Sequence, residues 1–253
     1  MTLHRILSWT PTAIVFDCDG TLLDTQHHWA EARERVLRER GLTPPAGFAE
    51  RAKGLHHIEC GRLMAEVTRR PDLGRDLADG LLRHFRATVG EQPLTMPGAR
   101  EMVAAAASFA PLAVASNCPR EVVESCLDDT GLLGYFRAVV VPEDTVRAKP
   151  HPDTHLTAAR ICRAAPSETL AVEGTQCGIL AAARAGLRVL GVGPWPGAEN
   201  TALTDLWVDT LKDPRLITWA AERVQAHIAW PRPVPAPAPV PSPAVEGLRG
   251  TLL

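Results

Sequence analysis

The sequence has no long hydrophobic run and no excess of charge of either sign. None of its apolar stretches approaches the ~20 residues that a membrane-spanning helix needs. Its 253 residues include 27 Lys and Arg and 29 Asp and Glu, so the formal net charge of −2 gives no reason to expect nucleic acid or an anionic membrane as a partner. With 45% hydrophobic and 22% charged residues, the composition is typical of globular proteins and excludes disorder of the whole chain.

Cysteine motifs and a nucleotide loop are also missing. The six cysteines are scattered, with no CxxC pair and no metal-ligand spacing. Residues 1–10 lack the apolar segment of a signal peptide. We therefore expect a cytoplasmic protein with reduced, mostly buried thiols. Gly191 and Gly193 are followed by Pro194, which does not open a helix as a dinucleotide-binding loop requires.

The pattern of apolar residues predicts an α/β protein with a helical insertion. Residues 13–16 are typical of a buried strand, and the pattern from 24 to about 89 is helical. After residue 97, expected strands at 112–115, 138–141, 170–172 and 188–192 alternate with expected helices at 119–129, 152–163 and 177–185, which indicates a parallel sheet. We predict a Rossmann-like core at 1–23 and 96–229 and a helical cap at 24–95, inserted after the first strand.

The last part of the chain, residues 230–253, has a different composition. Seven prolines alternate with other residues between 231 and 243, a pattern that prevents a helix and favours polyproline II. We expect a flexible tail outside the fold. It is either a binding site for a protein partner or an extension without function.

Polar side chains follow four of the expected strands. Ligands of open parallel sheets bind beyond the carboxyl ends of the strands, so we expect these side chains to form one site. They are Asp17 and Asp19 after the first strand, Ser116 and Asn117 after the second, Lys149 after the third and Glu173 at the end of the fourth.

These groups suit phosphoryl transfer. Asp17 would attack phosphorus and form an aspartyl-phosphate, and Asp19 would protonate the leaving oxygen and then activate water. Ser116 and Lys149 would hold the phosphoryl oxygens. The carbonyl of Cys18 could join the carboxylates in holding Mg²⁺, which prefers oxygen ligands.

The string from Val15 to Thr25 is more specific than an isolated Asp-x-Asp pair. With Ser116-Asn117 and Lys149-Pro150, it resembles the first three motifs of the haloacid dehalogenase-like hydrolases that have a helical cap, a group that includes phosphoglycolate phosphatases, β-phosphoglucomutases and sugar-phosphate phosphatases. The resemblance covers residues 13–193. It implies a magnesium-dependent phosphatase of a small phosphate monoester, such as a sugar phosphate or a phosphoglycolate-like acid.

The resemblance also implies binding residues. Gly20, Thr21 and Asn117 fall in the motifs that contact the phosphate, and the loop that begins at Lys53 aligns with the substrate-specificity loop of the cap. Lys53 and His57 are therefore candidate substrate ligands. Where the mutase has an arginine in this loop, the present chain has His57, which favours hydrolysis over mutase chemistry.

The fourth motif departs from the family pattern. Gly174 stands where the family has its usual metal-binding Asp, and we expect Glu173 to complete the metal site with Asp17 and Asp19. Two alternatives stay open: a phosphomutase, and a binding or regulatory protein whose catalysis is weakened by Gly174. His151 and His155 lie four residues apart without a third ligand nearby, which favours a hydrogen-bonded or solvated pair.

Overall fold

The computed structural model describes residues 6–89, 93–143 and 146–229. Their strands form one parallel sheet in the order β3-β2-β1-β4-β5-β6. Since β1 lies between β2 and β4, the strand order reverses between β1 and β4, where ligands of such sheets bind. The strands are β1 (Ala13–Phe16), β2 (Leu112–Ala115), β3 (Phe136–Val140), β4 (Thr169–Glu173), β5 (Arg188–Val192) and β6 (Leu206–Val208).

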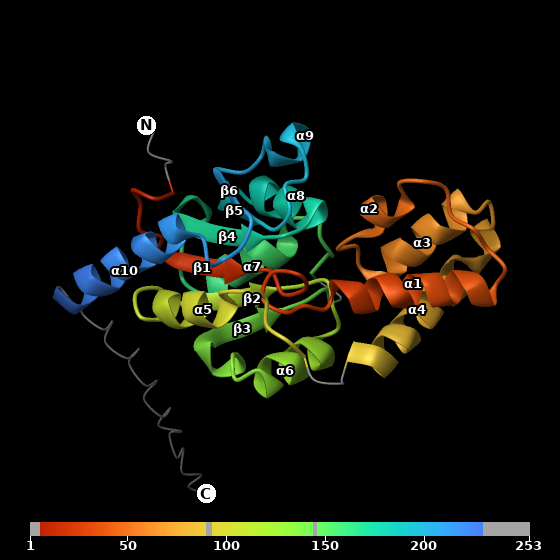
Figure 1. Cartoon of the computed structure of the whole chain (residues 1–253), viewed down its shortest axis with the longest axis horizontal. Coiled ribbons are helices and arrows are strands. Elements are labelled where there is room, and N and C mark those ends of the chain that lie inside the picture. The colour runs from red at the N-terminus through yellow and green to blue at the C-terminus, as the bar shows by residue number, and fades with distance from the viewer. Residues whose placement is uncertain (1–5, 90–92, 144–145, 230–253) are drawn as a thin grey trace, which may run out of the picture.

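Helices cover both faces of the sheet (Figure 1). Successive strand residues point to opposite faces. Ile14 and Phe16 therefore join the cluster that includes residues of α5 (Ala99–Ala107), α6 (Arg120–Asp129) and α10 (Pro214–Ala229). Ala13 and Val15 join the cluster with α7 (Asp153–Ile161) and α8 (Gln176–Arg184). Both strand faces are buried, as the continuous apolar run of β1 predicts.

Four helices between β1 and α5 form a separate layer at one end of the sheet, and we call this layer the cap (Figure 1). They are α1 (Gln26–Glu39), α2 (Phe48–Ala52), α3 (His57–Val67) and α4 (Gly74–Val89). Trp29 of α1 stacks on Phe85 of α4, with ring centroids 3.6 Å apart. The two crossings to this layer lie side by side, because Asp24 N–H donates to the Leu94 carbonyl at 2.9 Å. Residues 90–92, near the end of the predicted cap, lie outside the described residues.

The predicted strands agree with the structure to within two residues. The short strand β6 and the helices α9 (Ala198–Thr201) and α10 were not predicted. The proline-rich segment 230–253 lies outside the described residues.

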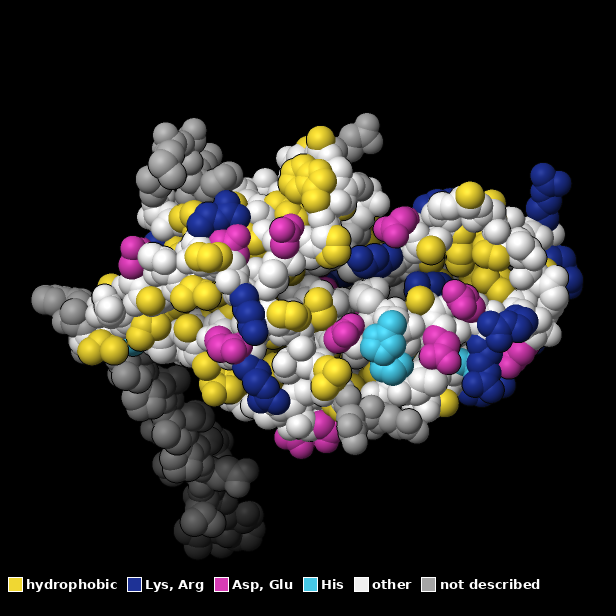
Figure 2. Space-filling view, in the orientation of Figure 1, with side chains coloured by type: hydrophobic (Ala, Val, Ile, Leu, Met, Phe, Trp, Pro, Cys, Tyr) yellow, Lys and Arg dark blue, Asp and Glu magenta, His cyan; other side chains and the backbone are white. Residues whose placement is uncertain are grey.

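No helix among the residues that the structure describes is long and apolar enough to cross a membrane. Figure 2 shows basic and acidic side chains interspersed on the face drawn.

Candidate active site

Asp17 and Asp19 lie where β1 ends in a tight turn. The Asp17 N–H still donates to the Val172 carbonyl of β4 at 2.9 Å. The turn then closes because the Cys18 carbonyl accepts hydrogen bonds from the amides of residues 21–23. That carbonyl is occupied within the turn, and its part in holding a metal stays a prediction. Gly20 has φ of +80°, a backbone conformation that glycine adopts without strain.

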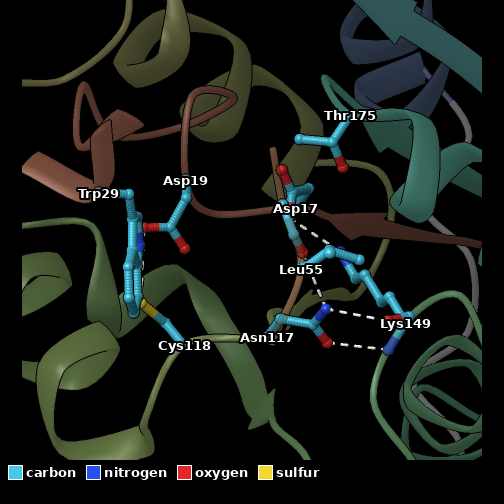
Figure 3. A pocket seen from close by; sticks show the side chains of 9 residues that line it. Asp17, Asp19, Trp29, Leu55, Asn117, Cys118, Lys149 and Thr175 are labelled. Atoms are coloured by element: carbon cyan, nitrogen blue, oxygen red, sulfur yellow. Dashed lines mark hydrogen bonds and ion pairs between the residues drawn. The ribbon is translucent and has the colours of Figure 1, made fainter. Parts of the chain in front are cut away.

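Lys149 lies at the centre of the site, between two carboxylates. Its Nζ is 2.8 Å from Asp17 Oδ1 and 2.8 Å from Glu173 Oε1 (Figure 3 shows the first of these contacts). The Lys149 side chain is 1% exposed and that of Glu173 is 0% exposed. Burial alone would lower the pKa of Lys149, but the negative charges of Asp17 and Glu173 outweigh it and raise that pKa. Lys149 is therefore a fixed positive charge beside Asp17.

Hydroxyl groups hold the other carboxylate oxygens of the first motif. Thr21 Oγ1 donates to Asp17 Oδ2 at 2.9 Å, Thr25 Oγ1 donates to Asp19 Oδ1 at 2.7 Å, and Ser116 Oγ donates to Asp19 Oδ2 at 3.2 Å. Burial raises the pKa of both aspartates, and the charge of Asp17 raises that of Asp19 further. Ser116 and Thr21 thus lie in the site, each directed at an aspartate, and their contact with a phosphate stays a prediction.

Asn117 connects three parts of the site. Its Nδ2 donates to the Lys149 carbonyl at 3.1 Å and to the Gly54 carbonyl at 2.9 Å, and its Oδ1 accepts from the Lys149 N–H at 2.8 Å. The paired bonds to Lys149 join the loop after β2 to the loop that follows β3 (Figure 3). The bond to Gly54 joins both loops to the cap.

The cap closes the site through Gly54. Its carbonyl also accepts from Cys177 Sγ at 3.0 Å, and a Cβ at position 54 would stand 2.8 Å from the Thr175 side chain. The pocket that remains around Asp17 has a volume of about 20 Å³, which is room for about one water molecule. A phosphate ester can therefore enter only after the Gly54 loop moves away from the core.

The structure does not place Lys53 or His57 in this pocket. His57 begins α3, and Lys53 lines a neighbouring cavity of about 580 Å³. The cap residues that line the pocket are Trp29, Gly54 and Leu55. The predicted loop is thus at the site, but Gly54 and Leu55 line the pocket in place of the predicted Lys53 and His57.

His155 and Cys118 are neighbours of the site that we did not predict. His155 Nε2 lies 2.8 Å from Glu173 Oε1, and both side chains are 0% exposed. Burial lowers the pKa of His155 well below its usual value, which favours the neutral form of the ring. His151, its predicted pair, is exposed, and this leaves His155 as the hydrogen-bonded member. Cys118 lines the pocket on the Asp19 side (Figure 3).

The family resemblance implies magnesium, so the available donors matter. Asp17 and Asp19 line the pocket, whereas Glu173 does not line it and bonds to Lys149 and His155 instead. Gly174 supplies no carboxylate. Among the described residues, no three or more His, Cys, Asp or Glu side chains are arranged to hold a metal ion. The described residues therefore do not bring three carboxylates together around the pocket, and Glu173 as a metal ligand stays a prediction.

Residues 14–192 match the haloacid dehalogenase-like hydrolases, and the chain belongs to this family. It is 29% identical over 219 residues to the validoxylamine A 7'-phosphate phosphatase of Streptomyces hygroscopicus subsp. limoneus, which covers 81% of this chain and 95% of that protein. It is 27% identical over 183 residues to the fructose-1-phosphate phosphatase YqaB of Escherichia coli, which covers 71% of this chain and 95% of the relative. The predicted enzyme class, a phosphoric monoester hydrolase, is confirmed by the family and by these phosphatases.

Solved structures agree on the fold. The β-phosphoglucomutase of Clostridium difficile superposes with a TM-score of 0.72 at 19% identity, covering 87% of this chain and 100% of that one. CbbY of Rhodobacter sphaeroides in complex with phosphate superposes with a TM-score of 0.66 at 22% identity, covering 81% and 96%. The predicted Rossmann-like fold is confirmed by these likenesses.

Proposed function

We propose that this chain hydrolyses a small phosphate monoester through an aspartyl-phosphate on Asp17. The observation that carries the proposal is the buried pair of Asp17 and Lys149, 2.8 Å apart at the carboxyl end of β1. It combines a carboxylate nucleophile with a fixed positive charge for the phosphoryl group. The phosphatase names of the relatives support the same reaction.

The reaction takes two displacements at phosphorus. First, an Asp17 oxygen bonds to phosphorus while the bond to the ester oxygen breaks, and Asp19 gives a proton to that departing oxygen. Next, a water molecule attacks phosphorus, Asp19 takes its proton, and Asp17 leaves as a carboxylate. Lys149 offsets the negative charge on the phosphoryl oxygens in both steps, and Asn117 fixes the Lys149 backbone.

Magnesium has no step in this proposal, because the site lacks a third carboxylate ligand. Its use is general among phosphatases of this family, and Asp17 and Asp19 remain at the pocket. Turnover measured without Mg²⁺ therefore shows whether Lys149 alone is enough to offset the negative charge of the phosphoryl group.

The cavity of about 580 Å³ beside the pocket suits the alcohol part of the substrate. Its volume is within the range of about 300–1,000 Å³ typical of small-molecule sites. Thr175 lines both the cavity and the Asp17 pocket. Trp195, which is 60% exposed, offers an aromatic face there, and Glu50 and Lys53 offer charged partners for hydroxyl groups. We infer a phosphorylated sugar or similar polyhydroxylated ring in preference to a phosphoglycolate-like acid.

The test is phosphate release from a panel of sugar phosphates and phosphoglycolate, with and without Mg²⁺, beside Asp17→Asn. We expect release from a ring phosphate that disappears in the variant. Turnover that persists in folded Asp17→Asn would exclude Asp17 as the nucleophile.

A second candidate is a protein that binds a phosphate ester without turning it over. The observation that favours it is Gly174, which leaves the site short of one carboxylate. If the wild type binds an ester but releases no phosphate, and Gly174→Asp releases it, this second candidate is correct. A phosphomutase is separated from both by a requirement for a bisphosphate activator without net phosphate release.

A further inference from the structure

His155 has a place in the site that the reaction scheme does not yet use. It is the third residue of α7, the helix that follows the Lys149 loop, and its side chain is completely buried. A carboxylate accepts hydrogen bonds and does not donate them, so Nε2 of His155 donates to Glu173 Oε1 at 2.8 Å. The other ring nitrogen lies 3.5 Å from Thr154 Oγ1.

Glu173 has few other restraints. Its Oε1 accepts from Lys149 and His155, and its buried Oε2 has no hydrogen-bond partner. Without His155, Lys149 would be its sole hydrogen-bonding partner among the described residues. The carboxylate could then rotate and draw the ammonium group with it.

The direction of the Lys149 ammonium depends on this carboxylate. Two of its three N–H bonds go to Asp17 and Glu173, which leaves the third for a phosphoryl oxygen in the pocket that Lys149 lines. We propose that His155 is a positioning residue, which holds Glu173 so that Lys149 points at Asp17 and the phosphoryl group. This role rests on the proposed function.

The test compares His155→Phe, which keeps a ring and removes the donor, with His155→Gln, which restores an N–H at a similar reach. His151→Phe is the matched control, because His151 is exposed near the start of the same helix. With p-nitrophenyl phosphate, we expect kcat to fall roughly 10- to 100-fold in His155→Phe with KM nearly unchanged, and to recover mostly in His155→Gln. Thermal melts of all variants identify any loss that follows stability alone.

A second readout does not require turnover. The chain has three lysines, Lys53, Lys149 and Lys212, so ε-¹³C-lysine labelling gives a simple NMR spectrum in which Lys149→Arg assigns the Lys149 signal. We expect that signal to shift in His155→Phe and to return in His155→Gln. Unchanged kcat and an unmoved Lys149 signal in folded His155→Phe would overturn the inference. If the wild type hydrolyses no ester, the proposed function fails and the NMR comparison still decides the role of His155.

Discussion

Gly178, in the first turn of α8, leaves room for the Glu173 carboxylate. A Cβ at this position would overlap Oε2 and Cδ of Glu173 and stand 2.9 Å from Oε1. Both side-chain positions are buried, so the carboxylate cannot move into solvent. Gly178→Ala should therefore displace Glu173 and weaken its contacts with Lys149 and His155.

The expected cost is the sum of three contributions. Overpacking a core typically costs about 1–3 kcal/mol, and each weakened hydrogen bond to a charged group adds about 1.5–3 kcal/mol at most. Alanine is a better helix former than glycine by about 1 kcal/mol, which offsets part of this. With about 2 kcal/mol for overpacking and about 1–3 kcal/mol for the two hydrogen bonds together, we expect Gly178→Ala to lose about 2–4 kcal/mol, or roughly 4–16 °C in Tm for a domain of this size.

The assay is thermal unfolding beside kcat, with Gly74→Ala as the control. Gly74 begins α4, and the nearest atom to its added Cβ would be 3.7 Å away, an ordinary contact. The same chemical change should therefore leave Gly74→Ala at least as stable as the wild type and fully active. If Gly178→Ala has the same Tm and the same kcat as the wild type, the described packing of Glu173 is wrong.

Three further predictions concern the metal, the substrate and the cap. Gly174→Asp should bind Mg²⁺ at least about tenfold more tightly than the wild type, a gain of about 1.4 kcal/mol in binding free energy that calorimetry would measure. Equal affinity of the two proteins would mean that position 174 does not face a metal. Trp195→Ala should raise KM for sugar phosphates roughly two- to tenfold, since aromatic contacts contribute about 0.5–1.5 kcal/mol, and should spare phosphoglycolate; an equal rise for both esters would remove Trp195 from the sugar site. Cys177→Ala should speed hydrogen exchange around Gly54 roughly two- to fivefold, because it removes a donor to the Gly54 carbonyl, while Cys177→Ser keeps a donor and should not. Identical exchange in the two variants would show that this hydrogen bond does not hold the cap.

The convergence of the motifs could be predicted because it follows from topology. Asp17, Asn117 and Lys149 all follow parallel strands, whose carboxyl ends share one edge of the sheet. No knowledge of side-chain packing is needed for that step. The same reasoning does not identify the cap residues at the pocket, because whether Leu55 or His57 faces Asp17 depends on how the cap loop lies against Thr175.

The orientation of Glu173 depends on packing that the sequence reasoning did not include. We expected it to replace the missing carboxylate at position 174, but neighbouring strand residues point to opposite faces. Glu173 lies two residues after Ala171, which packs with α7 and α8, and so it faces the same side of the sheet, where His155 lies. A Cβ at position 174 would instead face Thr21. The alternation was readable from the sequence, whereas His155 as the partner was not, because it depends on how α7 packs on the sheet.

The central claim is that Asp17 carries the phosphoryl group during turnover. The direct measurement is acid quenching of the enzyme during hydrolysis of a reactive ester, followed by mass spectrometry of the peptide that contains Asp17. We predict the added mass of one phosphoryl group on Asp17, lost on treatment with hydroxylamine and absent in Asp17→Asn. Steady hydrolysis with no phosphorylated Asp17 at any quench time, and with full turnover by Asp17→Asn, would contradict the account.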